Sequence, residues 1–236
     1  MQKIMVCLER PSEFENEEWS EGISDLLHSH QHDLRAAYFT VEDQHVAQAK
    51  NIRLENTPHP KNAIISAWLK NIYSLDHFFA DLESLGRYQG YNVVENRNNP
   101  FKQRAGRTPG FCQTCLLTKP ATQSQQQWLD IWLGAGTKIS LETQASYSLT
   151  QNITTSVMPI KSEQSDAWVP LGGIVQDYFF DEAMLSRKVF FDAKGDHEKY
   201  LENEQRLISS CLRFIDFDHF DCVPMTQYVI KGCDWR

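Results

Sequence analysis

The chain is 236 residues long, with 41% hydrophobic and 23% charged residues, which is the balance of one ordinary globular domain or of two small ones. This composition excludes a collagen-like chain, a low-complexity array and wholesale disorder. The net charge of −8 at pH 7 argues against a nucleic-acid partner or an anionic membrane surface, because both attract basic proteins. It leaves a small-molecule partner open.

An apolar run at residues 4–8 is the only hint of a targeting segment near the N-terminus. A secretory signal needs an apolar stretch of roughly 7–15 residues, and a membrane span needs roughly 18. No window of the sequence meets either requirement. The six cysteines are scattered along the chain, so we expect reduced thiols and a cytoplasmic protein.

The first part of the chain predicts four strands and two helices from its hydrophobic periodicity. The helix after the first strand carries apolar residues at steps of three to five, from Phe14 to Leu27. The second helix is expected to be capped by Ser74 and ended by Gly86. The predicted strands are residues 3–8, 34–41, 62–69 and 88–95.

A polar stretch, residues 95–110, is the best candidate for a linker, and the same order of elements begins again after it. Thr122 and Gln125 have the spacing of a capping box at the start of a helix. Asp181 is expected to cap a further helical stretch, and a longer helix follows it. The predicted strands are residues 110–117, 147–157, 168–180 and 222–230.

Two strand–helix–strand–strand–helix–strand units predict an α+β protein built of two tandem ferredoxin-like units, residues 1–105 and 106–236. Two such sheets in one chain can pack face to face or curl into an intramolecular α/β barrel, with a pocket between sheet and helices. We expect the halves to touch through sheet residues, and any homodimer to be additional to that contact. The residues expected at this contact are Phe39, Ile64, Cys115 and Val175.

The second half resembles the EthD family of dimeric α/β-barrel proteins. The resemblance rests on residues 128–132 (Trp-Leu-Asp-Ile-Trp), 136–137 (Gly-Thr), 142–147 (Glu-Thr-Gln-Ala-Ser-Tyr) and 151–152 (Gln-Asn). The closing segments 213–218 and 224–228 are also similar to two-repeat members. The resemblance implies this barrel fold, a pocket for a small molecule and, where members are enzymes, chemistry without a bound cofactor. One departure is Gly136, which stands where the family usually has histidine.

Trp128, Trp132 and Gly136 are spaced at i, i+4 and i+8, so they share one helix face. This face is either an aromatic wall of a ligand pocket or a stripe packed on the sheet. The resemblance adds Thr137 to the expected substrate-binding residues.

Glu142, Tyr147 and Asn152 form a second group of candidates around the end of this helix. A glutamate inside an apolar pocket has a raised pKa and can act as a general acid or base. Tyr147 and Asn152 could then orient a substrate carbonyl or phenol. The alternative is that Glu142 points into solvent and that Asn152 serves the backbone.

Two further patterns carry less weight. His28, His30 and His32 fall at a helix end, where alternate residues point in different directions, so no metal site is expected. Cys112 and Cys115 have the spacing of a redox motif, but they lie on a predicted strand and face opposite sides of it. No motif indicates a nucleotide, flavin or haem, and we expect no cofactor.

The sequence therefore leads to two hypotheses from different classes. The first is an EthD-like barrel that binds a small apolar or aromatic molecule and acts as a cofactor-independent oxidoreductase or cyclase. The second is a non-catalytic, small-molecule-binding or stress-related barrel. A titratable side chain inside the pocket favours chemistry, whereas a purely apolar lining favours binding.

Overall fold

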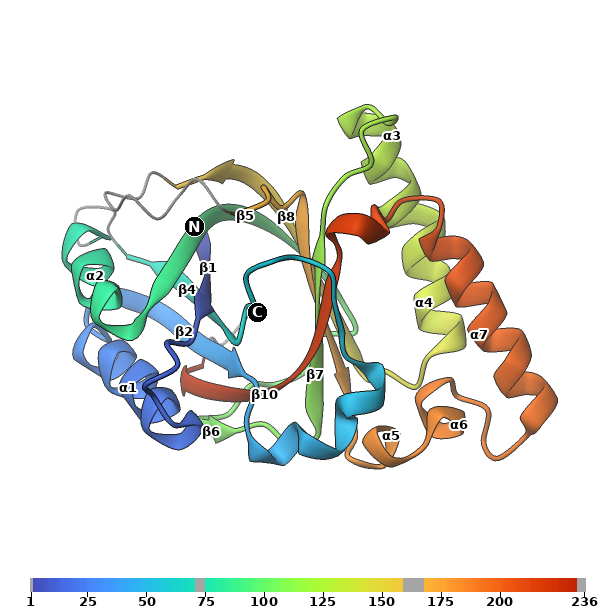
Figure 1. Ribbon diagram of the computed structural model, residues 1–236, viewed down its shortest axis with the longest axis horizontal. Helices are drawn as coiled ribbons and strands as arrows, with labels where there is room; N and C mark the ends of the chain where they lie inside the picture. Colours follow the sequence, from blue (N-terminus) through green and yellow to red (C-terminus); the bar gives the residue numbers. More distant parts are fainter. Residues whose placement is uncertain (1, 71–74, 159–167, 233–236) are drawn as a thin grey trace.

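Eight long antiparallel strands close into a barrel (Figure 1). The computed structural model describes residues 2–70, 75–158 and 168–232. The strands follow the order β2-β4-β1-β5-β8-β9-β7-β10, and β10 pairs back on β2. Their bounds are Lys3–Glu9 (β1), Leu34–Val41 (β2), Ala63–Leu69 (β4), Arg87–Asn98 (β5), Phe111–Leu117 (β7), Ser148–Val157 (β8), Gly173–Phe179 (β9) and Asp221–Lys231 (β10).

Helices cover two opposite sides of the barrel (Figure 1). On one side lie α1 (Asn16–Ser29) and α2 (Leu75–Leu82), which continues into a 3₁₀ turn, η3 (Glu83–Leu85). On the other side a continuous helical segment is formed by α3 (Gln125–Asp130), the π-helix η4 (Ile131–Gly136) and α4 (Thr137–Thr143). The helix α7 (His197–Cys211) packs beside it. Shorter elements are α5 (Glu182–Leu185), α6 (Arg187–Phe190), η1 (Gln44–Ile52) and η6 (Phe217–His219).

The order of strands repeats, as the sequence predicted for tandem ferredoxin-like units. Within the first sheet the order is β2-β4-β1-β5, and within the second it is β8-β9-β7-β10. The two sheets join edge to edge through the pairs β5–β8 and β10–β2, so they curl into one barrel and do not stack face to face. Within the described residues, closure gives every long strand a partner on both edges. The prediction of an α+β protein with an intramolecular barrel is confirmed.

Alternate residues of each strand face the barrel interior or the helices, because the side-chain period of a strand is two. Ile64 faces the interior, in a cluster that combines both halves. Phe39 faces the helices, but its ring stacks on Tyr228 of β10, with centroids 5.2 Å apart. Cys115 and Val175 instead pack against the helices of their own half. The expected contact between halves is therefore wrong for these last two residues.

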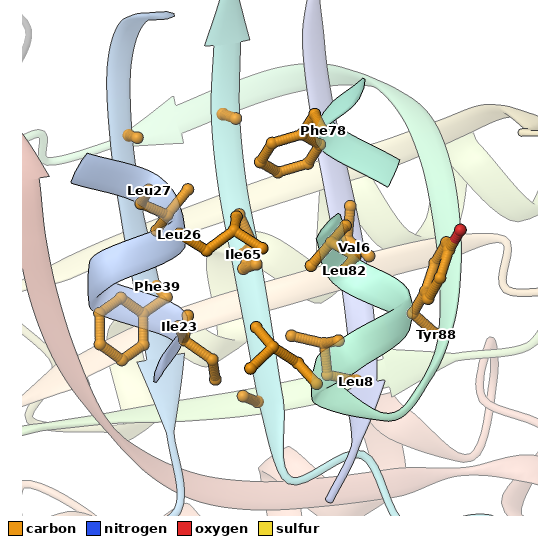
Figure 2. Packing of buried hydrophobic residues seen from close by; sticks show 14 of the residues in the cluster. Val6, Leu8, Ile23, Leu26, Leu27, Phe39, Ile65, Phe78, Leu82 and Tyr88 are labelled. Atoms are coloured by element: carbon orange, nitrogen blue, oxygen red, sulfur yellow. The ribbon is translucent and has the colours of Figure 1, made fainter. Parts of the chain in front are cut away.

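The helix-facing side of the first sheet is packed with apolar side chains (Figure 2). Ile23 and Leu27 of α1 and Leu82 of α2 lie over the strands and are fully buried. The indole Nε1–H of Trp19 donates to the Leu85 carbonyl, at 2.6 Å. This bond ties the first helix to the end of the second.

Several details differ from the sequence prediction. The capping box uses Ser124 and Gln127 instead of Thr122 and Gln125, because two Ser/Thr-x-x-Gln patterns overlap and only one fits the start of the helix. The sequence did not predict β3 (Leu54–Glu55) and β6 (Gly106–Arg107), which each pair with β10, because two-residue strands have no periodicity. It also did not predict the 3₁₀ helix η1. The expected cap Ser74 lies outside the described residues.

Candidate functional site

A pocket of about 460 Å³ lies between the outer face of the second sheet and the helices α4 and α7. These two helices are on the right in Figure 1. Strands β7, β8, β9 and β10 form its floor. Residues of the η1 segment, Asn51 and Ile52, reach it from the first half of the chain. Its apolar lining includes Leu117, Trp132, Leu149, Val175, Phe190, Phe191, Leu207, Ile208, Phe214, Phe217 and Phe220. This size and lining are typical of a site for a small organic molecule.

Asp177 contributes a carboxyl group to the pocket floor. It lies on β9, is only 4% exposed and lines the pocket between Gln113 of β7 and Leu149 of β8, its partners in register. Burial raises the pKa of its carboxyl to about 7, although the Ser146 side chain and the backbone N–H of Tyr178 lower it in part. Its Oδ1 atom has no hydrogen-bond partner among the described residues. Such a carboxyl can take or give a proton at neutral pH.

Two of the residues predicted from the sequence, Trp132 and Thr137, line this pocket. Thr137 Oγ1 donates to the Trp132 carbonyl and accepts from Gln151 Nε2, both at 2.9 Å. The Trp132 ring lies against Gly173, where an added Cβ would come within 2.3 Å of it. The helix and the sheet are therefore in close contact at this end of the pocket, and Gly173 is required for that approach.

Trp128 is fully buried but does not line the pocket. Its Nε1–H donates to the Phe214 carbonyl at 2.8 Å, and its ring packs on Trp132, with centroids 4.7 Å apart. The same kind of bond joins Trp19 to Leu85 in the first half. Trp128 thus links the first helical segment to the chain after α7, which corresponds to the packing alternative for this helix face.

Glu142 lies at the surface, with its side chain 42% exposed. It forms ion pairs with Arg206, at 2.5 Å, and with Lys138, at 3.8 Å. It is not among the residues that line the pocket. The burial on which a role as general acid or base depended is absent, because the last turn of α4 presents this residue toward α7 and solvent.

Tyr147 and Asn152 are also placed away from the pocket. Tyr147 packs on Phe101 and Phe180, with ring centroids 5.3 and 4.8 Å apart, and its hydroxyl donates to the Pro109 carbonyl at 3.3 Å.

Asn152 faces the barrel interior, because it is one residue out of phase with the pocket-facing Gln151 on β8. Register thus decides which of the two neighbours meets a ligand.

Asn152 belongs to a buried polar group inside the barrel. Its Oδ1 accepts from Lys3 Nζ at 2.7 Å, and Lys3 also pairs with Glu95 at 2.5 Å. The ammonium lies over the Trp68 ring, 4.5 Å from its centroid. Burial lowers the pKa of Lys3 to about 8, and Glu95 opposes that shift. These contacts satisfy the buried charge and connect β1, β5 and β8.

Sequence reasoning missed Asp177 and the glutamines beside it. A signal was present: in the predicted strand 168–180, Gly173, Val175, Asp177 and Phe179 share one face. A carboxylate on an otherwise apolar strand face is unusual and marks a site worth testing.

Gly136, where the EthD family usually has histidine, lines the pocket at the end of the π-helix η4. An added Cβ would come within 3.0 Å of Phe214 Cε1 and 3.2 Å of the Ile131 carbonyl. Phe214 therefore lies against the position from which a side chain would enter the pocket. π-Helical turns are found frequently at functional sites, and here the turn brings Trp132 and Gly136 to the same cavity.

Of the histidine triplet His28, His30 and His32, the structure pairs His30 with an aspartate. His30 Nε2 lies 2.7 Å from Asp81 Oδ2, and its ring packs edge-on against Phe78. Among the residues that the structure describes, no three His, Cys, Asp or Glu side chains are grouped as metal ligands. In the same described ranges, no helix has the length and apolar character that crossing a membrane requires.

The fold and the pocket define the chain as an α/β-barrel protein with two ferredoxin-like units. Its structure is similar to that of an anthrone oxidase-like protein, with a TM-score of 0.56 at 9% identity, over 98% of this chain and 92% of the other. It also matches a candidate monooxygenase from Fusobacterium nucleatum (TM-score 0.47, 10% identity, 100% and 97% covered). A mutant chlorite dismutase from Candidatus Nitrospira defluvii gives a TM-score of 0.45 at 8% identity, with 97% and 91% covered.

No family model matches the chain, that of the EthD family included, and no curated protein matches it in sequence. At such low identities the structural likeness establishes the fold and says nothing about the reaction.

Proposed function

We propose that the chain is a cofactor-independent oxidoreductase or cyclase that acts on a small apolar or aromatic molecule. The observation that carries this proposal is the Asp177 carboxyl, buried in a largely apolar pocket with a pKa of about 7. A purely binding pocket has no need of such a group, whose burial disfavours its charged form. Asp177 takes the role of acid or base that the sequence had suggested for Glu142.

In this proposal Asp177 removes a proton from a carbon or phenol activated by a neighbouring carbonyl. The anion that forms is electron-rich enough to pass electrons to O₂ or to close a ring. For a substrate with an activated CH₂ group, the net oxidation consumes one O₂, converts the CH₂ to a carbonyl and releases one water. Trp132 and the phenylalanines of the lining would stack on a flat ring, and Thr137 would contact the substrate beside Trp132.

The EthD-like assignment remains part of the proposal. It is supported by the tryptophan and Glu-Thr-Gln motifs of residues 128–144, and Gly136 counts against a mechanism that needs the family's usual histidine. Tyr147, Asn152 and Glu142 lie outside the pocket, so they enter only through their effects on neighbouring residues. A homodimer also remains a proposal, and sedimentation of the purified chain tests it.

The experiment measures O₂ uptake with anthrone, a tricyclic ketone with an activated CH₂, chosen because of the fold shared with an anthrone oxidase-like protein. We expect uptake to rise as pH increases through about 7, since the base must be ionised. Asp177→Asn should lower the rate roughly 10²–10⁴-fold, the usual contribution of a positioned base, and change the Kd only slightly.

Glu142→Gln is assayed beside Asp177→Asn. If Glu142→Gln abolishes uptake and Asp177→Asn does not, the assignment of the base is wrong. The binding-protein alternative predicts a different result: aromatic ligands bind with the same Kd to the parent and to Asp177→Asn, and no substrate with an activated CH₂ is converted.

A further inference from the structure

Three cysteines from distant parts of the sequence line the pocket: Cys115 of β7, Cys211 at the end of α7 and Cys222 of β10. Cys115 and Cys222 are partners in register on adjacent antiparallel strands. Their sulfur atoms are 3.2 Å apart, and the Cys115 thiol donates to Cys222. Both are free thiols in this structure.

The two thiols are not equivalent. The Cys222 sulfur accepts from Cys115 and also from Gln113 Nε2, at 2.9 Å. Two donors therefore point at one sulfur, and the thiolate form of a cysteine is the nucleophile in thiol chemistry. The pKa of Cys115 is raised, first because its thiol proton is held by Cys222 and also because of burial. Cys115 thus keeps its proton, which leaves the Cys222 sulfur as the attacking atom of the pair.

The backbone is already arranged for a bond between them. Residues directly opposite on antiparallel strands have Cα atoms about 4.5–5.5 Å apart, which lies inside the range that disulfides span. The sulfur atoms must approach by only about 1 Å to reach the length of about 2.05 Å of an S–S bond. The chain around the two residues can keep its strand pairing during that change.

We propose that Cys115 and Cys222 are an oxidisable dithiol in the pocket floor, converted by a peroxide into a cross-strand disulfide. The Cys222 thiolate attacks one oxygen of hydrogen peroxide, breaks the O–O bond and becomes a sulfenic acid as hydroxide leaves. The Cys115 sulfur then displaces the sulfenic oxygen as water. In sum, two thiols and one H₂O₂ give one disulfide and two waters.

The structure also supplies a built-in control. Cys112 lies three residues from Cys115 on the same strand but faces the barrel interior, where it is fully buried, and burial raises its pKa to about 12. A peroxide that enters the pocket reaches Cys115 and Cys222 and does not meet Cys112. The proposal concerns reactivity of the pocket floor, so it stands independently of whether Asp177 is a catalytic base.

The test treats the reduced full-length chain with hydrogen peroxide, with Cys233, which lies outside the described residues, replaced by serine in every sample. We expect an intact-mass loss of about 2 Da and a non-reduced peptide map with one linkage, Cys115 to Cys222. Cys112→Ser and Cys211→Ser should give the same linkage. Cys115→Ser should instead accumulate a sulfenic acid at Cys222 that dimedone traps.

Three results would overturn the proposal: no mass loss in the folded parent, a linkage between Cys211 and Cys222, or dimedone labelling of Cys115 in the Cys222→Ser variant. Thermal melting checks that each variant is folded. Where Cys222→Ser does not fold, Cys222→Ala replaces it, and the peptide map of the parent alone still decides between the linkages.

Discussion

The two helix–sheet interfaces of the barrel have the same topology and different contents. In the first, the helix-facing residues of β1 and β4 are apolar without exception, and α1 and α2 pack onto them in one continuous cluster (Figure 2). In the second, helix-facing positions of β7, β8 and β9 carry Gln113, Gln151 and Asp177, and a pocket separates them from α4 and α7. The first interface stabilises the barrel, and the second is the candidate site.

The contrast between the two interfaces shows which of them tolerates a cavity. The tryptophans of the first helical segments, Trp19 and Trp128, make equivalent bonds to the chain at the end of the second helices. These bonds hold both helix pairs on their sheets. In the second interface the aromatic residues gather into two separate clusters, one around Trp132 and Phe214 and the other around Phe190 and Phe191. Both clusters line the pocket.

The largest expected effect comes from placing an asparagine at one helix-facing position of β4 and at one of β9, the equivalent strand of the second sheet. Ile65 of β4 is fully buried under the helices, whereas Val175 of β9 lines the pocket. Ile65→Asn should cost about 4–5 kcal/mol of unfolding free energy, because it removes packing and buries an unpaired amide. Val175→Asn should cost about 1–2 kcal/mol, since the pocket can admit water to the amide. Urea denaturation measures both, and equal costs would contradict the contrast between the interfaces.

The second test uses pH. Because the pKa of Asp177 is raised to about 7 in the folded protein and lies near 3.9 when unfolded, the unfolded chain releases its proton first. Unfolding free energy should therefore fall as pH rises from about 4 to about 7, by on the order of 4 kcal/mol at most. Asp177→Asn should remove this part of the pH dependence and be more stable than the parent at pH 8. A parallel pH profile in the variant would show that burial does not raise the pKa of Asp177 in the folded protein.

The smallest expected effect compares two leucines on the second helices. Leu82 of α2 is fully buried, and Leu82→Ala should cost about 3 kcal/mol through the cavity that it leaves. Leu207 of α7 lines the pocket, so Leu207→Ala enlarges an existing space and should cost about 1 kcal/mol. Denaturation midpoints at constant m-value give both numbers. A larger loss of unfolding free energy for Leu207→Ala than for Leu82→Ala would mean that α7 depends on the packing of Leu207.

The order of the elements and the fold class follow from the sequence itself. The sequence predicted all eight long strands, some as short apolar runs and others as alternating segments, because both are local patterns. The repetition of the order on either side of residues 95–110 then predicted the tandem barrel. The helix with Trp128 and Trp132 was also recognised, since residues four apart share a helix face.

Only the tertiary structure decided which of these residues surround a cavity. Trp132 and Trp128 are one turn apart, yet only Trp132 reaches the pocket, because α7 and the chain that follows it cover Trp128. Glu142 is half-exposed and pairs with Arg206 of α7, whereas Asp177 lines the pocket. Because neighbouring residues of a strand face opposite sides, Gln151 faces the pocket and Asn152 faces the barrel interior. Local pattern determines what a segment becomes, whereas the packing of distant segments determines which side chains share a space.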